Sequence, residues 1–154
     1  MAQMAKTIYG LVVDKFEGRT DKAGAPYIHH LLHVANAAYS RYNGDIRLLR
    51  VGLLHDIMED TDLSLSELME TQGVTVEIAQ AVMAMTHLKN ETYSEYIERV
   101  SKNSLARRVK ICDLEHNMDL FRLPQITAKD VERYCKYLKA LEYLKEVEEN
   151  GAGL

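Results

Sequence analysis

Apolar residues recur every three or four positions along most of this chain, with polar residues between them. This spacing is typical of amphipathic α-helices that bury one face. Strand-like alternation of apolar and polar residues does not occur. We therefore expect an all-α fold of about seven or eight helices, at residues 4–16, 27–42, 46–58, 66–71, 76–85, 93–100, 105–120 and 128–148.

Turn and cap residues separate several of these segments. Asp21 to Gly24 precede Pro26, and Asn43-Gly44-Asp45 is a typical turn sequence. Ser64 with a glutamate three residues later predicts a capping box, and Thr127 is expected to cap the last helix. Residues 148–154 include two glycines and are expected to fray.

The size and composition of the chain limit the classes of function. With 154 residues and 47% hydrophobic content, we expect one domain covering residues 1–154. A net charge of −4 offers no long-range attraction to nucleic acid or to an anionic membrane, so the expected partner is a small molecule. Two cysteines without paired spacing and the lack of a signal sequence favour the cytoplasm. No run of about 18 apolar residues indicates a membrane span, and the sequence leaves an oligomer possible.

Three histidines lie close together in PYIHHLLHVA, residues 26–35. On a helical wheel, His29 and His33 fall on a polar face. His30 falls in a different sector, among small apolar residues that would let another helix approach closely (Val34, Ala37 and Ala38). A histidine in such a place needs a polar partner. From this helix alone, a backbone carbonyl and a metal ion are both open as partners of His30.

Four titratable side chains lie close together in LLHDIMEDTD, residues 53–62. His55 and Asp56 follow an apolar run, and Glu59 and Asp60 come one helical turn later, so all four would share a face about 140° wide. Burying these groups together is costly unless a cation is bound. The apolar run before them argues against a merely solvated acidic helix end.

A third polar patch lies on the otherwise apolar segment VKICDLEHNMDL, residues 109–120. Asp113 has Lys110 three residues before it, His116 three residues after it and Asn117 four residues after it. A surface ion pair between Lys110 and Asp113, worth about 0–1 kcal/mol, is the simple alternative to a functional site.

The three patches together offer two imidazoles and two carboxylates in the order H…HD…D, from His30, His55, Asp56 and Asp113. Nitrogen and oxygen ligands without thiolate suit manganese, iron, magnesium or zinc, with positions left for water and substrate. The sequence therefore predicts a metal site within residues 26–120.

These segments resemble the HD-domain metal-dependent phosphohydrolase superfamily. Within it, the chain is similar to the hydrolase domain of the RelA/SpoT homologue family and to the small alarmone hydrolases. The resemblance rests on DKAGAPYIHHLLHVA, GLLHDIMEDT and LARRVKICDLEHNMDL and runs from about residue 5 to residue 123. It implies an HD-domain helical bundle in which the four residues above bind the metal. The expected ion is Mn²⁺, with Fe²⁺, Mg²⁺ or Zn²⁺ as alternatives.

The same resemblance gives roles to other side chains. Glu59 and Asp60 match an acidic pair that assists attack by metal-activated water. Asn117 matches an asparagine of the nucleotide pocket, and Lys22 matches a basic residue of the loop next to the base. The residues expected to contact the substrate are Arg19, Lys22, Lys110 and Asn117.

Some positions depart from the family pattern. Phe16 and Arg19 stand where histidine and glutamine are common, and Asp21 stands where an arginine often precedes Lys22. Beyond Asn117, Asp119 and Leu120 replace the usual basic and hydroxyl residues. These departures leave the expected metal ligands intact. They affect the positions expected to recognise the base and the second diphosphate of the substrate.

The resemblance implies a hydrolase that removes the 3′ pyrophosphate of (p)ppGpp or of its adenine analogue. One alternative keeps the chemistry and changes the substrate: a metal-dependent nucleotidase or a phosphatase acting on a dinucleotide cofactor. Another alternative is a non-catalytic HD module that binds a nucleotide or a partner protein. Retention of both Glu59 and Asp60 argues against that last reading.

Overall fold

The computed structural model describes residues 6–152. Outside the helices of this range, β-type pairing is limited to two isolated bridges, so the predicted all-α class is confirmed. None of the described helices has the length and apolar character needed to cross a bilayer. The elements are α1 (Ile8–Phe16), α2 (Tyr27–Arg41), α3 (Ile46–Leu54), α4 (Ile57–Asp60), α5 (Leu65–Glu70), α6 (Val76–Met85), α7 (Tyr93–Ser101), α8 (Ser104–Asn117), the short 3-10 helix η1 (Leu120–Arg122) and α9 (Ala128–Ala152).

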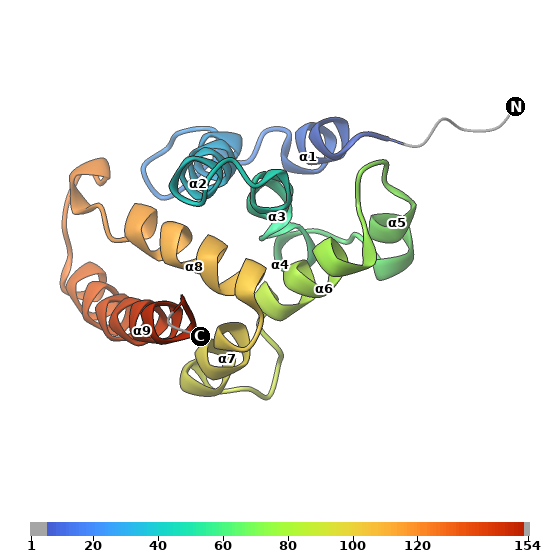
Figure 1. The fold of residues 1–154 in the computed structure, drawn as a ribbon. Helices are drawn as coiled ribbons and strands as arrows, with labels where there is room; N and C mark the ends of the chain where they lie inside the picture. Colours follow the sequence, from blue (N-terminus) through green and yellow to red (C-terminus); the bar gives the residue numbers. More distant parts are fainter. Residues whose placement is uncertain (1–5, 153–154) are drawn as a thin grey trace, which may run out of the picture.

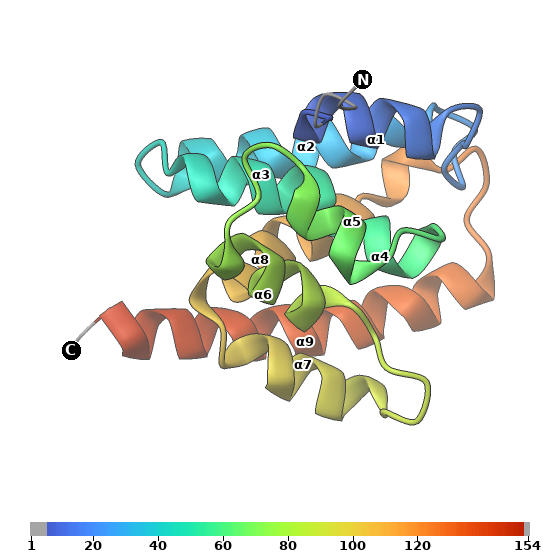
Figure 2. The same ribbon diagram turned by 90° about the vertical axis from the view of Figure 1, so that its right-hand side faces the viewer.

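Helix α8 lies at the centre of the bundle. Helices α2 and α3 cover one side of it, and α7 and α9 cover the other side (Figure 1). A view at right angles shows α9 running along the bundle for most of its length (Figure 2). One hydrophobic cluster joins residues from α1 through α9, and Leu54 and Leu114 are fully buried within it. Residues that follow Leu54 or precede Leu114 are thereby held next to the core.

The predicted caps explain where several helices begin. The Ser64 side chain accepts from the amide of Glu67, and the Glu67 side chain accepts in return from the amide of Ser64, so the predicted capping box is confirmed. A second capping box, at Thr92, was not predicted and begins α7. The Thr127 hydroxyl accepts from the amide of Asp130 at the start of α9. Local side chains thus fix these boundaries.

The helix predicted for residues 46–58 is two helices. The Nδ1 atom of His55 donates to the carbonyl of Gly52 at 2.6 Å. That carbonyl would otherwise accept an amide hydrogen from the next helical turn, so α3 ends at Leu54 and the single turn α4 follows Asp56. The break lies at the predicted metal ligands His55 and Asp56.

The last helix is longer than predicted. Helix α9 continues past residue 148 to Ala152 because Glu148 is not a frayed end: it accepts from the Nε atoms of Arg107 and Arg108, both at 2.6 Å. The prediction of fraying from residue 148 is therefore wrong as far as Ala152. Residues 4 and 5 of the first predicted helix, and residues 153 and 154, lie outside the described range.

Candidate metal centre

His55 is fixed by the break between α3 and α4. Its Nδ1 atom is bonded to the Gly52 carbonyl, which can only accept, so Nδ1 carries the hydrogen and Nε2 keeps a lone pair in the neutral ring. The Nε2 atom is buried without a hydrogen-bond partner. It faces two carboxylate oxygens, Asp56 Oδ2 at 3.0 Å and Asp113 Oδ1 at 3.4 Å.

His30 reaches the same point from α2. Its Nε2 atom lies 3.1 Å from Oδ1 of Asp113, which α8 supplies, and 3.7 Å from Oδ2 of Asp56. One ligand atom each from His30, His55 and Asp56 lies within 4.8 Å of the others. Three segments that are far apart in the sequence therefore converge on one small volume.

The convergence fits a divalent cation. An imidazole lone pair and two carboxylates repel one another unless a positive charge lies between them. Burial lowers the pKa of His55, but the charges of Asp56 and Asp113 outweigh burial and raise that pKa well above its ordinary value. A divalent ion would supply positive charge at this point, and two nitrogens with two oxygens are a donor set that such ions accept.

Hydrogen-bond donors surround the two carboxylates. The hydroxyl of Tyr27 donates to Oδ2 of Asp56 at 2.6 Å. Lys110 Nζ donates to Oδ2 of Asp113, and Asn117 Nδ2 donates to Oδ1 of Asp113, each at 2.8 Å. We predicted Lys110 and Asn117 as substrate contacts. Both line the cavity, but in this structure they orient Asp113.

The acidic pair of α4 stands at the edge of the same cavity. Glu59 and Asp60 both line it, and Glu59 accepts from the backbone amide of His87 at 3.2 Å. Burial, and then the charges of Asp56 and Glu59, raise the pKa of Asp60. Arg19 is not among the lining residues: its side chain is exposed and donates to the backbone carbonyl of Asp60. The structure therefore gives Arg19 no direct place in the cavity.

The cavity has a volume of about 530 Å³, and several cationic side chains line it. Lys22 lines it, and burial and then the positive charge of Arg133 lower the pKa of Lys22. Arg133, Lys136 and Tyr137 come from α9. Sequence reasoning missed these three, although their three- and four-residue spacing puts them on one helix face. The sequence did not indicate that α9 covers the site.

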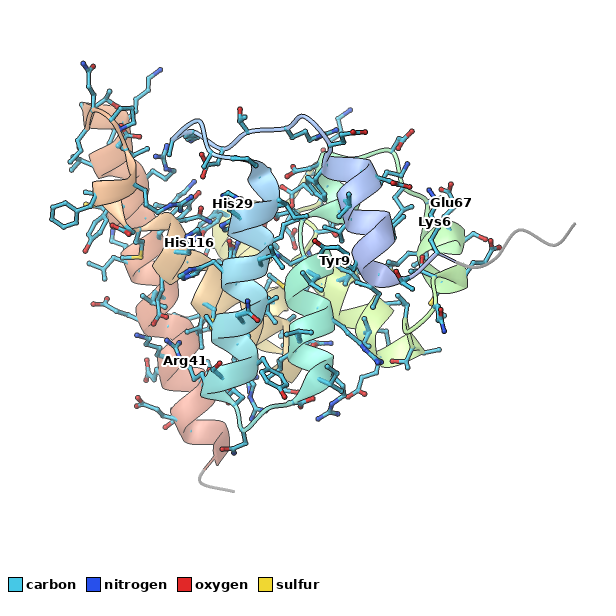
Figure 3. The ribbon with its side chains drawn as sticks, turned by 90° about the horizontal axis from the view of Figure 1, so that it is seen from above. Lys6, Tyr9, His29, Arg41, Glu67 and His116 are labelled. Carbon is cyan, nitrogen blue, oxygen red and sulfur yellow. The ribbon has the colours of Figure 1, made fainter. Side chains whose placement is uncertain are left out.

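The sequence did not indicate that His116 contacts His33 and His30. The ring of His116 stacks on the exposed ring of His33 at 3.9 Å between centroids, and its Nδ1 atom lies 2.7 Å from Nδ1 of His30. Figure 3 shows His116 on α8 next to α2, which also carries His29. Burial, and then the charge of Arg122, lower the pKa of His116 to about 3. His29 is exposed, and neither His29 nor His33 lines the cavity.

Known proteins are similar to this chain in sequence and in fold. Residues 9–116 match the HD domain family. The chain is 31% identical over 137 residues to guanosine-3′,5′-bis(diphosphate) 3′-pyrophosphohydrolase of Haemophilus influenzae, covering 79% of this chain and 20% of that protein. It is 34% identical over 102 residues to guanosine-3′,5′-bis(diphosphate) 3′-pyrophosphohydrolase MESH1 of Danio rerio, covering 64% of this chain and 57% of that protein.

A solved structure has the same fold. It comes from work describing a metazoan orthologue of SpoT that hydrolyses ppGpp, and it superposes with a TM-score of 0.72 at 22% identity over 96% of this chain and 94% of the other. The chain spans a fifth or less of the length of the bacterial relatives. The match to the family covers more than half of this chain and includes all four predicted metal ligands. The chain belongs to the HD-domain family.

Proposed function

We propose that this chain is a divalent-metal-dependent phosphohydrolase that removes pyrophosphate from the 3′ position of a guanosine or adenosine alarmone such as (p)ppGpp. One observation carries the proposal: two histidines and two carboxylates converge in a cavity whose wall also presents Lys22, Arg133 and Lys136. Such a cavity combines a cation site for a reacting phosphate with positive charge for further phosphates. The names of the relatives support the same substrate class.

The proposed metal ligands are His30, His55, Asp56 and Asp113, and the proposed ion is Mn²⁺. When bound, such an ion polarises a phosphoryl oxygen and lowers the pKa of a water molecule. The chain prepares these ligands by hydrogen bonds. Gly52 fixes the ring of His55 with its carbonyl, and the donors around Asp56 and Asp113 hold the carboxylate planes.

The remaining residues handle protons and charge. We assign proton transfer to Glu59 and Asp60, because the raised pKa of Asp60 lets its carboxyl group hold a proton closer to neutral pH. We assign the binding of the non-reacting phosphates to Lys22, Arg133 and Lys136. Tyr137 and Tyr93 add aromatic surface to the same cavity, which suits a nucleotide base.

A metal-supplemented nucleotide screen tests the proposal. The purified chain is incubated with Mn²⁺ and a panel that includes ppGpp, mononucleotides and dinucleotide cofactors, and the products are identified. We expect pyrophosphate from ppGpp and no activity in Asp56→Ala. The matched control is Asp62→Ala, which removes an exposed carboxylate six residues further along and should leave activity unchanged.

The same screen separates the alternatives. Orthophosphate from another nucleotide would make the chain a nucleotidase or a cofactor phosphatase. Tight binding of a nucleotide without hydrolysis would make it a binding module. Activity retained in Asp56→Ala would refute the metal centre itself.

A further inference from the structure

Arg122 of η1 lines the cavity and is held beside His116. Its Nη2 atom donates to Oδ2 of Asp21 at 2.5 Å, and its Nη1 atom donates to the backbone carbonyl of His116 at 2.9 Å. Asp21 is itself fixed, because its Oδ1 atom accepts from the amides of Ala23 and Ala25. The guanidinium is therefore anchored on both sides, by Asp21, which is 101 residues away in the sequence, and by the carbonyl at the end of α8.

The same Nη1 atom lies 3.1 Å from Nδ1 of His116. A guanidinium has only donors, so the lone pair of His116 Nδ1 must face it. A hydrogen on that nitrogen would point one donor at another. Arg122 therefore selects the tautomer of the neutral His116 ring in which Nδ1 is the acceptor.

His116 passes this selection on to His30. The Nδ1 atoms of the two rings lie 2.7 Å apart, so one must donate and the other accept. Since His116 Nδ1 is the acceptor, His30 Nδ1 carries the hydrogen. The neutral His30 ring then has its lone pair on Nε2, which faces Oδ1 of Asp113 at 3.1 Å. That carboxylate oxygen can only accept, so it favours the opposite tautomer unless a cation lies between the two atoms.

The tautomers of the two proposed histidine ligands are fixed by different kinds of partner. The Nδ1 atom of His55 meets the backbone carbonyl of Gly52, which can only accept and so fixes the tautomer by itself. The Nδ1 atom of His30 meets another imidazole, which can either donate or accept. A further group is needed to decide which of the two Nδ1 atoms carries the hydrogen. Arg122 contacts Nδ1 of His116 and can make that choice.

We propose that Arg122 is a positioning residue that acts through His116 to hold His30 in the tautomer able to bind a metal ion. This inference rests on the metal centre of the proposed function and does not depend on the substrate. Asp21 takes part as the anchor of Arg122. Partners behind a ligand histidine typically change metal affinity by about 10- to 100-fold.

The first test reads the tautomer directly in the metal-free protein. Nitrogen-15 NMR of the imidazole rings at alkaline pH should show a larger fraction of His30 protonated on Nδ1 in the unmodified chain than in Arg122→Met. In the variant, His116 Nδ1 is free to donate to His30 Nδ1, while Asp113 accepts from His30 Nε2. An equal fraction in the two proteins overturns the proposal.

The second test measures Mn²⁺ affinity by calorimetry. We expect Arg122→Met to bind Mn²⁺ about tenfold more weakly, and Asp21→Asn to lie between it and the unmodified chain. The control Arg47→Met removes an exposed arginine that pairs with Asp45 and Glu77 and should leave affinity unchanged. Unchanged affinity in Arg122→Met overturns the proposal.

A double variant shows whether the effect passes through His116. In a His116→Leu background, Arg122→Met should cause no further loss of Mn²⁺ affinity, and a further tenfold loss would overturn the proposal. Thermal unfolding of each variant identifies general damage to the fold. If Arg122→Met is unfolded, Asp21→Asn supplies both readouts, and an unshifted tautomer with unchanged affinity there overturns the proposal. Neither readout needs substrate, so a chain that binds Mn²⁺ in this way but hydrolyses no nucleotide would refute only the proposed function.

Discussion

Gly52 of α3 lies directly against Ala35 of α2. A Cβ atom at position 52 would lie 2.5 Å from the Cα of Ala35 and 2.9 Å from its amide nitrogen. Sequence reasoning expected a close approach at another sector of the helix, around Val34, Ala37 and Ala38. The contact at Ala35 matters for the site because α2 carries His30 and α3 leads directly into His55.

Gly52→Ala should destabilise the fold and weaken metal binding together. The added methyl group meets backbone atoms, which cannot move aside, so we expect a loss of about 3 kcal/mol in the free energy of unfolding. Urea unfolding and Mn²⁺ calorimetry measure the two effects. Gly151→Ala is the control: it is also helical, and its Cβ would meet only Arg107 Nη2, at 3.9 Å. A stable Gly52→Ala protein with unchanged affinity would contradict the close crossing.

Lys110→Met should destabilise the metal-free protein more than the metal-loaded protein. The Lys110 side chain is 13% exposed and donates to the buried Asp113. Burial lowers the pKa of Lys110, but Asp113 outweighs burial and keeps the amine charged. Removing one member of a buried pair costs about 3 kcal/mol, and a bound cation would offset part of that cost.

Urea unfolding of Lys110→Met with and without Mn²⁺ measures this difference. Lys102→Met is the control, because Lys102 pairs with Glu98 on the surface, where such pairs contribute about 0–1 kcal/mol. An equal loss of stability with and without metal would show that a bound ion does not replace the positive charge that Lys110 supplies to Asp113.

Glu91 should make stability depend on pH in acid. Arg99 donates to both of its carboxylate oxygens, and these hydrogen bonds lower the pKa of Glu91 to about 2, from an ordinary value of 4.5. A lowered folded-state pKa stabilises the fold above the ordinary value, and that stability is lost as the pH falls from about 4.5 to about 2. Thermal unfolding of the metal-free protein across this range should fall less steeply in Glu91→Gln. Glu98→Gln, which removes a surface carboxylate, should follow the unmodified chain. Parallel curves for all three proteins would contradict this assignment.

Lys136→Met should raise the KM for ppGpp by about tenfold with little change in kcat. Lys136 lines the cavity on α9, and its ammonium lies over the rings of Tyr93 and Tyr137 at 4.5 and 5.4 Å. The loss of one charge-assisted contact to a non-reacting phosphate typically weakens binding by about tenfold. Steady-state kinetics with ppGpp check it. Lys129→Met removes an exposed lysine from the same helix, away from the cavity lining, and should leave the KM unchanged. A fall in kcat alone would place Lys136 in the chemical step instead.

Some features of the site could be predicted from short stretches of sequence. The wheel that separated His30 from His29 and His33 was correct: His30 is 3% exposed, whereas the other two are on the exposed face. The HD pair was expected on a continuous helix, but the bond from His55 to the Gly52 carbonyl breaks that helix. A side chain competing for a backbone carbonyl leaves no periodic signal.

The sequence by itself determined the all-α class and the capping box at Ser64, because helix periodicity and caps act over a few residues. Its three motifs indicated the family by resemblance. Only the tertiary structure decided which polar groups meet. It buried the Lys110–Asp113 pair, which the sequence allowed only as a surface pair, and it brought α9 over the cavity. It also joined Asp21 to Arg122 across 101 residues. Contacts over such separations depend on how whole helices pack their apolar faces, and packing places charged side chains that no local pattern assigns to one another.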